Sequence, residues 1–167
     1  VNVVKKKARK MVEQIAANYD DRMIRALELI LSWVFRKIFS GLNTHHIERL
    51  RETANSRQLI YMPSHRSHFD YLLISYTLYV QGLVAPHIAA GVNLNFWPVG
   101  GLLRRGGAFY IRRSFTGQPL YSAVFKSYLD VILSRGYPVE FFPEGGRSRT
   151  GRLLPPKKGM LRMTVDS

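Results

Sequence analysis

Apolar residues recur at intervals of three and four in the N-terminal part of the chain, at Ile24, Leu27, Leu31 and Phe35. Spacing of this kind predicts an amphipathic α-helix. Basic side chains fall elsewhere around the same helix, at Arg22, Arg25, Arg36 and Lys37. The segment is therefore predicted to be a basic amphipathic helix.

Helices are also predicted over residues 4–18 and 45–54, on either side of this one. Asp20 or Asp21 can cap the start of the central helix, and Gly41 is placed to end it. We therefore predict a helical, basic and amphipathic region over residues 1–55.

Short apolar runs alternate with longer segments in the rest of the chain. Strands are favoured at residues 58–62, 87–90, 107–111 and 137–142, and helices at residues 69–80 and 120–133. Strands separated by helices predict an α/β fold, here with a mixed sheet flanked by helices. We assign this domain to residues 56–167. We expect it to be incomplete at its C-terminal end, with no element completed after the Pro- and Gly-rich segment, and the chain to be a fragment of a longer protein.

Residues 71–103 contain no Asp, Glu, Lys or Arg. A stretch of this length can span a bilayer, since a membrane helix needs about 20 residues. Pro, Gly and Asn residues interrupt it, however, so buried or interfacial segments are the better interpretation. Such a stretch can also form ordinary core.

Composition narrows the classes of partner. The 167 residues are 46% hydrophobic, which is enough for one core, and 25 Lys and Arg against 11 Asp and Glu give a net charge of +14. This balance favours nucleic acid, an anionic lipid surface or phosphorylated small molecules. The absence of Cys excludes disulfides, zinc–thiolate sites and a Cys nucleophile.

A histidine stands five residues before an aspartate, at His65 and Asp70, where a predicted strand gives way to a helix. On one continuous helix the two side chains would point about 140° apart, so His65 must precede the helix. From the loop, its ring can fold back and donate one ring N–H to Asp70 while the other nitrogen faces a substrate hydroxyl. A histidine pKa of about 6.5 suits a general base held in this way.

A structural interpretation of the same residues stays open. Ser67 and Asp70 are three residues apart and form a pair like a capping box, which would only start the helix. His68 is expected to be solvated or bonded to backbone. No Ser nucleophile in an elbow is found.

Two arginine-rich segments follow strands. One holds Arg112 and Arg113, and the other runs through Glu144, Gly145, Gly146, Arg147, Arg149 and Arg152. Guanidinium groups bind phosphate in a bidentate manner, and amides exposed by glycine add to an anion cradle. A surface strand end, a solvated turn or a nucleic-acid contact would also explain them. Glu144 is expected to support the site as an ion-pair partner of arginines.

Residues 146–151 have the glycine spacing of a P-loop, but the pattern fails beyond them. Arg152 stands where Lys is required, Leu153 where Ser or Thr is required, and Pro155 and Pro156 prevent the helix that must follow. A nucleoside triphosphatase is therefore excluded.

In order and spacing, His65 to Asp70, the segment 107–113 and the segment 142–152 resemble the first three conserved blocks of the glycerol-3-phosphate acyltransferases. The similarity is greatest to the bacterial membrane-bound glycerol-3-phosphate 1-O-acyltransferase family. It extends from about residue 42 onward. The family's fourth block, an apolar strand with a Pro, would lie beyond Ser167.

The resemblance implies that a fatty acyl group moves from acyl-CoA or acyl-carrier protein to the 1-hydroxyl of glycerol 3-phosphate. The product would be lysophosphatidic acid, in the first step of phospholipid synthesis. By position, His65 would be the base and Asp70 its orienting partner. The phosphate site would comprise Arg112 or Arg113 together with Glu144, Gly145, Arg147 and Arg149. No covalent acyl-enzyme, metal or cofactor is implied.

The basic amphipathic helices favour attachment to a membrane surface with anionic lipid, at the cytoplasmic face of the bacterial inner membrane. Two alternatives in acceptor remain, dihydroxyacetone phosphate and lysophosphatidic acid. A nucleic-acid-binding module is the alternative of a different class. It would need basic residues interleaved with exposed aromatics on one face and a recognisable fold motif, and neither is found, so no nucleic acid is expected as a partner.

Overall fold

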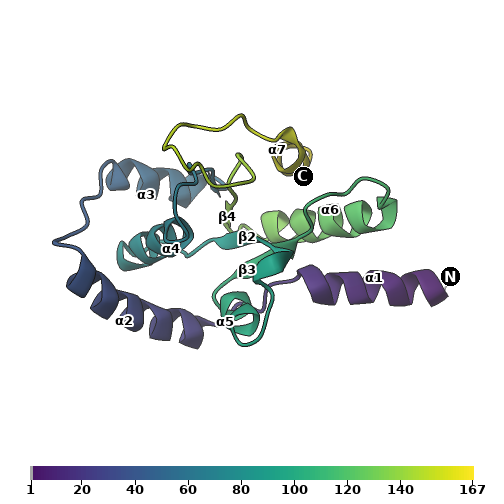
Figure 1. Cartoon of the computed structure of the whole chain (residues 1–167), viewed down its shortest axis with the longest axis horizontal. Coiled ribbons are helices and arrows are strands. Elements are labelled where there is room, and N and C mark those ends of the chain that lie inside the picture. Colours follow the sequence, from purple (N-terminus) through teal and green to yellow (C-terminus); the bar gives the residue numbers. More distant parts are fainter. Residues whose placement is uncertain (1) are drawn as a thin grey trace.

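A computed structural model describes residues 2–167 (Figure 1). The helices are α1 (Asn2–Ile15), α2 (Asp21–Ile38), α3 (Ile47–Ser56), α4 (Asp70–Val80), the 3₁₀ turn η1 (Val92–Leu94), α5 (Val99–Arg105), α6 (Pro119–Ser134) and α7 (Lys158–Val165). The strands are β1 (Ile60–Tyr61), β2 (His87–Gly91), β3 (Ala108–Ile111) and β4 (Val139–Glu140). Every helix and strand predicted from the apolar pattern is present, with shifted ends.

The four strands form one sheet in the order β1-β4-β2-β3, and all three pairings are parallel. The α/β class with flanking helices is confirmed, but the prediction of a mixed sheet was wrong. A helix lies in each connection, α4 between β1 and β2, α5 between β2 and β3, and α6 between β3 and β4. Crossovers of this kind return the chain in the same direction, whereas antiparallel neighbours need no helix between them.

The two faces of the sheet carry different layers. Side chains alternate between faces along a strand, so Phe109 and Val139 point to one face while Ala108 and Tyr110 point to the other. The first face forms the main core with α6, where Phe125 and Leu129 are fully buried. The second face carries a smaller cluster, against which Leu94 of η1 and Leu103 of α5 pack.

Helix α1 packs on the same core. It lies beside α6 in Figure 1, and its Ile15 is fully buried in the main cluster. The guanidinium of Arg104 on α5 donates to the carbonyl oxygen of Gln14 at 2.6 Å and also to that of Ala16. These contacts join the first helix to the α/β layers. The predicted cap of the next helix is confirmed at Asp20, which accepts from the Arg22 amide at 3.0 Å.

Two helices were not predicted from the sequence. Helix α5 contains Gly100, where an added Cβ would stand 2.6 Å from Asn95 Oδ1, so the close packing itself requires a glycine. Tyr110 fixes this turn by donating to the Gly100 carbonyl at 3.0 Å. Helix α7 contradicts the expectation that no element follows the Pro- and Gly-rich segment, because Met160 and Met163 pack against the main core.

The uncharged stretch of residues 71–103 divides into α4, β2, η1 and part of α5. Within residues 2–167, no helix combines the length and the apolar character that crossing a bilayer requires.

Candidate functional site

The carboxyl ends of the parallel strands meet at one edge of the sheet, where open α/β folds place their ligand sites. Strand β1 leads to His65, β3 leads to Arg112 and Arg113, and β4 leads to the glycine- and arginine-rich loop. Because β1 and β4 are neighbours, the histidine segment and this loop lie together. The three segments singled out in the sequence thus leave the same edge of the sheet.

His65 and Asp70 are in hydrogen-bond contact. The distance from His65 Nδ1 to Asp70 Oδ2 is 3.1 Å, and His65 precedes α4, which begins at Asp70. The backbone amides of Arg66 and Ser67 donate to the same Oδ2 at 2.7 and 2.8 Å. Partial burial raises the pKa of the Asp70 carboxyl, but the hydrogen bonds from Ser67, Arg66 and His65 outweigh it and hold the pKa below its usual value. Asp70 is therefore ionised and can orient the ring.

Some of the hydrogen bonds expected of a helix cap also form at Ser67 and Asp70. Asp70 accepts from the Ser67 amide, and Ser67 Oγ accepts from the Phe69 amide at 3.1 Å. The assigned N-cap residue of α4 is Phe69, which offers no side-chain cap. The same carboxylate therefore closes the turn before the helix and contacts the histidine, so the two interpretations of Asp70 are compatible.

Glu144 connects the two loops through backbone groups. Its Oε1 accepts from the His65 amide and its Oε2 from the Leu154 amide, both at 2.9 Å. These two bonds lower the pKa of the Glu144 carboxyl. The expected ion pair with arginine was wrong, since no ion pair involves Glu144 among residues 2–167. The arginines of this loop, Arg147 and Arg149, are exposed, whereas the buried Glu144 carboxylate accepts from backbone amides.

The arginine-rich loop is tied to the histidine a second time. The Ser148 amide donates to the His65 carbonyl at 2.8 Å. Gly145 has a φ of +62°, a left-handed conformation that glycine adopts without strain. Arg147 and Arg149 flank the buried Ser148 and are both exposed. No helix follows directly, because α7 begins only at Lys158, in agreement with the exclusion of a P-loop.

The two arginines after β3 differ in their surroundings. The guanidinium of Arg112 donates to Gln118 and, at 2.9 Å, to Gln14, and it lies 4.3 Å from the centre of the Tyr121 ring. Arg113 is exposed and has no hydrogen-bond or ion-pair partner among residues 2–167. Arg112 is therefore held by the protein, while Arg113 is available to a ligand.

A cavity of about 1190 Å³ extends from these residues over the second face of the sheet. His65, Arg112, Arg113, Gly145 and Arg147 line its polar end, and Arg149 is not part of the lining. Apolar side chains line most of the remainder, among them Leu72, Ile88, Leu94, Phe96 and Leu103 of the uncharged stretch, and α2 contributes Leu27, Leu31 and the acidic Glu28. The cavity thus combines a basic end that contains the His–Asp pair with a long apolar end.

Comparison with known families fits this arrangement. The sequence profile described as acyltransferase matches residues 41–167, which include the whole sheet and all three segments of the site.

The chain belongs to the acyltransferase family. Its relatives include the glycerol-3-phosphate acyltransferases of Shewanella sp. (strain ANA-3), Shewanella oneidensis and Shewanella denitrificans, each 57% identical over 157 residues, or 93% of this chain. The chain spans about a fifth of the length of these relatives.

Two residues of this candidate site were not found from the sequence. Lys157 lines the cavity although it lies beyond the segments with recognisable motifs. The Phe142 ring lies 4.1 Å from the His65 ring, centre to centre. Lys157 had a signal in the sequence, since it continues a basic segment after two prolines, whereas only the fold reveals the contact of Phe142.

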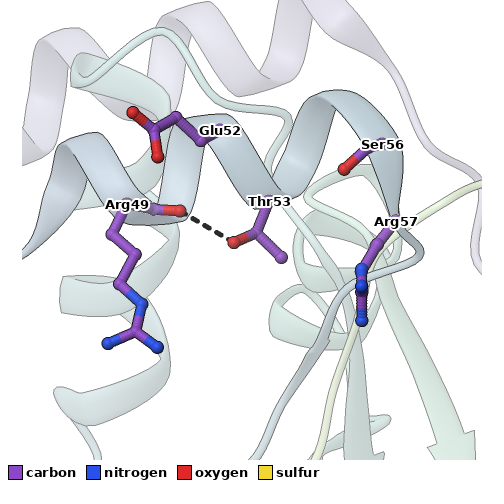
Figure 2. A pocket seen from close by; sticks show the side chains of 5 residues that line it. All are labelled: Arg49, Glu52, Thr53, Ser56 and Arg57. Carbon is purple, nitrogen blue, oxygen red and sulfur yellow. Dashed lines mark hydrogen bonds between the residues drawn. The ribbon is translucent and has the colours of Figure 1, made fainter.

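A second hollow lies on α3 and shares no lining residue with the candidate site (Figure 2). It has a volume of about 450 Å³ and is formed by side chains of α3 and its C-cap alone, Arg49, Glu52, Thr53, Ser56 and Arg57. The Thr53 hydroxyl donates to the Arg49 carbonyl at 2.8 Å, within the helix. This hollow is an exposed helix surface without converging reactive groups. No cluster of three or more His, Asp or Glu side chains suited to a metal ion occurs within residues 2–167.

Proposed function

We propose that the full-length protein transfers a fatty acyl group from a thioester to the 1-hydroxyl of glycerol 3-phosphate, giving lysophosphatidic acid. The observation that carries this proposal is the His65–Asp70 contact of 3.1 Å at the basic end of a cavity that is otherwise apolar. The names of the relatives support the same acceptor. A phosphorylated hydroxyl compound and a fatty acyl chain match the two ends of the cavity.

His65 acts as the general base in this reaction. With its proton on Nδ1 donated to Asp70, the neutral ring has Nε2 available to accept the proton of the hydroxyl. The hydroxyl oxygen then attacks the thioester carbonyl and forms an oxyester bond as the carbon–sulfur bond breaks. The imidazolium returns the proton to the leaving thiolate. Asp70 stabilises the transient positive charge and fixes the ring.

Arg113 and Arg147 bind the phosphate of the acceptor. Both are exposed and line the cavity near His65, and a phosphate monoester with about two negative charges suits guanidinium groups. Arg112, Glu144 and Gly145 maintain the shape of the site through the contacts described above. Arg149 is proposed as a more distant contributor of positive charge.

The thioester donor is acyl-CoA or acyl-carrier protein, and no cofactor takes part. The acyl chain occupies the apolar end of the cavity, between α2, α4 and the second face of the sheet. This placement is supported by the mostly apolar lining, which includes Leu31, Leu72 and Ala90, with Glu28 of α2 as its one acidic residue among residues 2–167.

The protein associates with the cytoplasmic face of a membrane that contains anionic lipid, in a bacterium the inner membrane. Helix α2 has two apolar sides. Ile24 and Phe35 are buried, while Leu29, Ile30 and Trp33 are exposed. Exposed basic residues surround this second side, namely Arg22, Arg25, Arg36 and Lys37. Such a helix suits the interface of an anionic bilayer.

The base assignment is tested with His65→Ala in the full-length protein, in membranes with matched expression. Incorporation of labelled glycerol 3-phosphate into lysophosphatidic acid is expected to fall by at least about 100-fold, the usual scale for loss of a general base. His45→Ala serves as the control, because His45 is exposed and lies outside the cavity lining.

Each other result has a defined meaning. Retention of more than a tenth of the wild-type rate would show that His65 is not the base. Transfer to dihydroxyacetone phosphate or lysophosphatidic acid, but not to glycerol 3-phosphate, would replace the proposed acceptor. If no thioester donor supports transfer and the protein binds random DNA with a steep dependence on salt, it is a nucleic-acid-binding protein instead.

A further inference from the structure

Lys157 lies across Gly145. A Cβ added at Gly145 would stand 2.7 Å from Lys157 Cδ, 3.1 Å from Cε and 3.2 Å from Nζ. The lysine side chain therefore occupies the space that any side chain at position 145 would need. The Lys157 amide also donates to the Pro143 carbonyl at 2.7 Å. The backbone and the side chain of Lys157 thus both contact the loop that follows β4.

The ammonium group of Lys157 is not neutralised by the protein. Among residues 2–167 its Nζ has no ion pair and no hydrogen bond, although the residue lines the same cavity as His65 and Arg147. Lys126 differs, because its Nζ binds Asp130 at 2.9 Å and the Asp166 carbonyl at 3.0 Å. Lys157 is exposed, its side chain lies on Gly145 in the cavity lining, and its charge has no partner, so it is placed to meet an anion.

We propose that Lys157 binds the phosphate group of the acceptor, together with Arg113 and Arg147. The proposal rests on the function proposed above. Lysine is a compact point charge that binds phosphate without the directional demands of a guanidinium, so it complements two arginines.

The acceptor, and not the donor, is the anion that fits this position. In glycerol 3-phosphate the reacting hydroxyl and the phosphate belong to one three-carbon molecule, so the phosphate must lie close to His65. Lys157 meets this condition, because it lies on Gly145 in a loop that binds both the amide and the carbonyl of His65. The phosphates of a coenzyme A donor are separated from the thioester by the pantetheine arm and would lie farther from the base.

The test compares Lys157→Met with wild type, Lys157→Arg and Lys158→Met in the full-length enzyme. Methionine keeps an unbranched stem but removes the charge, and the neighbouring Lys158 is exposed and does not line the cavity. We expect Lys157→Met to raise the KM for glycerol 3-phosphate by about tenfold, the scale of one charge-assisted hydrogen bond. The kcat and the KM for the acyl donor should change by less than about threefold. Lys157→Arg should recover most of the affinity, and Lys158→Met should behave as wild type.

Three results would overturn the proposal in an active enzyme. These are an unchanged KM for glycerol 3-phosphate in Lys157→Met, a rise confined to the KM for the donor, and a loss of kcat alone. Circular dichroism of each variant excludes a general loss of fold as the cause.

Calorimetric titration with glycerol 3-phosphate separates this proposal from the proposed function. If wild type binds the compound but transfers no acyl group, the function fails, and weaker binding by Lys157→Met would still support the lysine. If wild type does not bind glycerol 3-phosphate, both proposals are wrong.

Discussion

The side chain of Glu140 is fully buried in β4, and neither carboxyl oxygen has a hydrogen-bond partner among residues 2–167. Its neighbour Val139 belongs to the main core, so Glu140 points to the other face of the sheet, the face that carries the cavity. Burial, and to a smaller extent the charge of Asp70, raise the pKa of Glu140 to about 8. The carboxyl is therefore neutral at pH 7 in the folded protein.

This raised pKa gives the stability of the fold a definite dependence on pH. Between the ordinary value of 4.5 and about 8, the folded protein keeps a proton at Glu140 that the unfolded chain releases. The contribution of Glu140 to stability is thus fully present below pH 4.5 and is lost as the pH rises through this window.

Glu140→Gln is expected to remove that loss, because the amide stays neutral. The melting temperature of the variant relative to wild type should increase from pH 5 to pH 8, measured by thermal denaturation. Glu52→Gln, at an exposed position, controls for removal of a carboxylate. A difference between Glu140→Gln and wild type that is the same at both pH values would show that Glu140 is ionised in the folded protein.

Single residues differ in how far the sequence could reveal their contacts. The geometry of His65 and Asp70 was predictable, because five residues and the turn of a helix limit where the two side chains can meet. The contact of Glu144 with the His65 amide was not, since it joins residues 79 positions apart that only the pairing of β1 with β4 brings together. The choice between Arg112 and Arg113 likewise required the positions of Gln14 and Gln118.

At the scale of elements, α4 carries both parts of the site. It begins at Asp70, which contacts His65, and the same first turn places Leu72 in the cavity lining. Leu73, the next residue, is partly buried but does not line the cavity. One helix therefore fixes the base at its start and bounds the apolar end of the cavity with its side.

Leu72→Trp should narrow the proposed acyl site without touching the His–Asp pair. The larger ring takes up space in the cavity, so the full-length enzyme should shift its preference from long-chain to shorter-chain acyl-CoA, with kcat/KM as the measure. Leu73→Trp is the matched control and should keep the wild-type chain preference. If the two variants show the same preference, the acyl chain lies elsewhere.

The failure to predict α5 has a physical cause. Local propensity argues against a helix at α5, which contains two adjacent glycines, and tertiary contacts with Asn95 and Tyr110 decide its conformation. The long helices were predictable, because their apolar periodicity reports directly which side is buried. The expectation of a mixed sheet was wrong in part because α5 was missed, since without a helix between residues 90 and 107 nothing indicated the crossover that makes β2 and β3 parallel.

At the scale of the whole molecule, α2 separates the cavity from the outside. Leu27 and Leu31 line the cavity, whereas Trp33 is 61% exposed on the same helix. If this exposed side rests on a bilayer as proposed, the apolar end of the cavity lies directly behind the helix that contacts the lipid. A hydrophobic donor chain and the lipid product would then have a short path to the membrane.

Trp33→Ser is expected to weaken binding of the full-length protein to vesicles of phosphatidylcholine and phosphatidylglycerol by about tenfold. This is the scale of the free energy gained by burying an aromatic side chain. Val131→Ser, which alters an apolar residue exposed on α6, should have little effect. Added salt should weaken wild-type binding, since basic residues surround Trp33. Equal binding by the two variants in a flotation assay would assign membrane contact to another surface.

Two hydrogen bonds between the His65 backbone and the loop after β4 fix the distance between the histidine and that loop. One runs from the His65 amide to Glu144 and the other from the Ser148 amide to the His65 carbonyl, so the base and the loop that carries Arg147 move as one piece. For an acceptor bound as proposed, the separation between its hydroxyl and its phosphate is then measured against a fixed length. An acceptor with one carbon more or fewer between these groups would be rejected by geometry, whatever its charge.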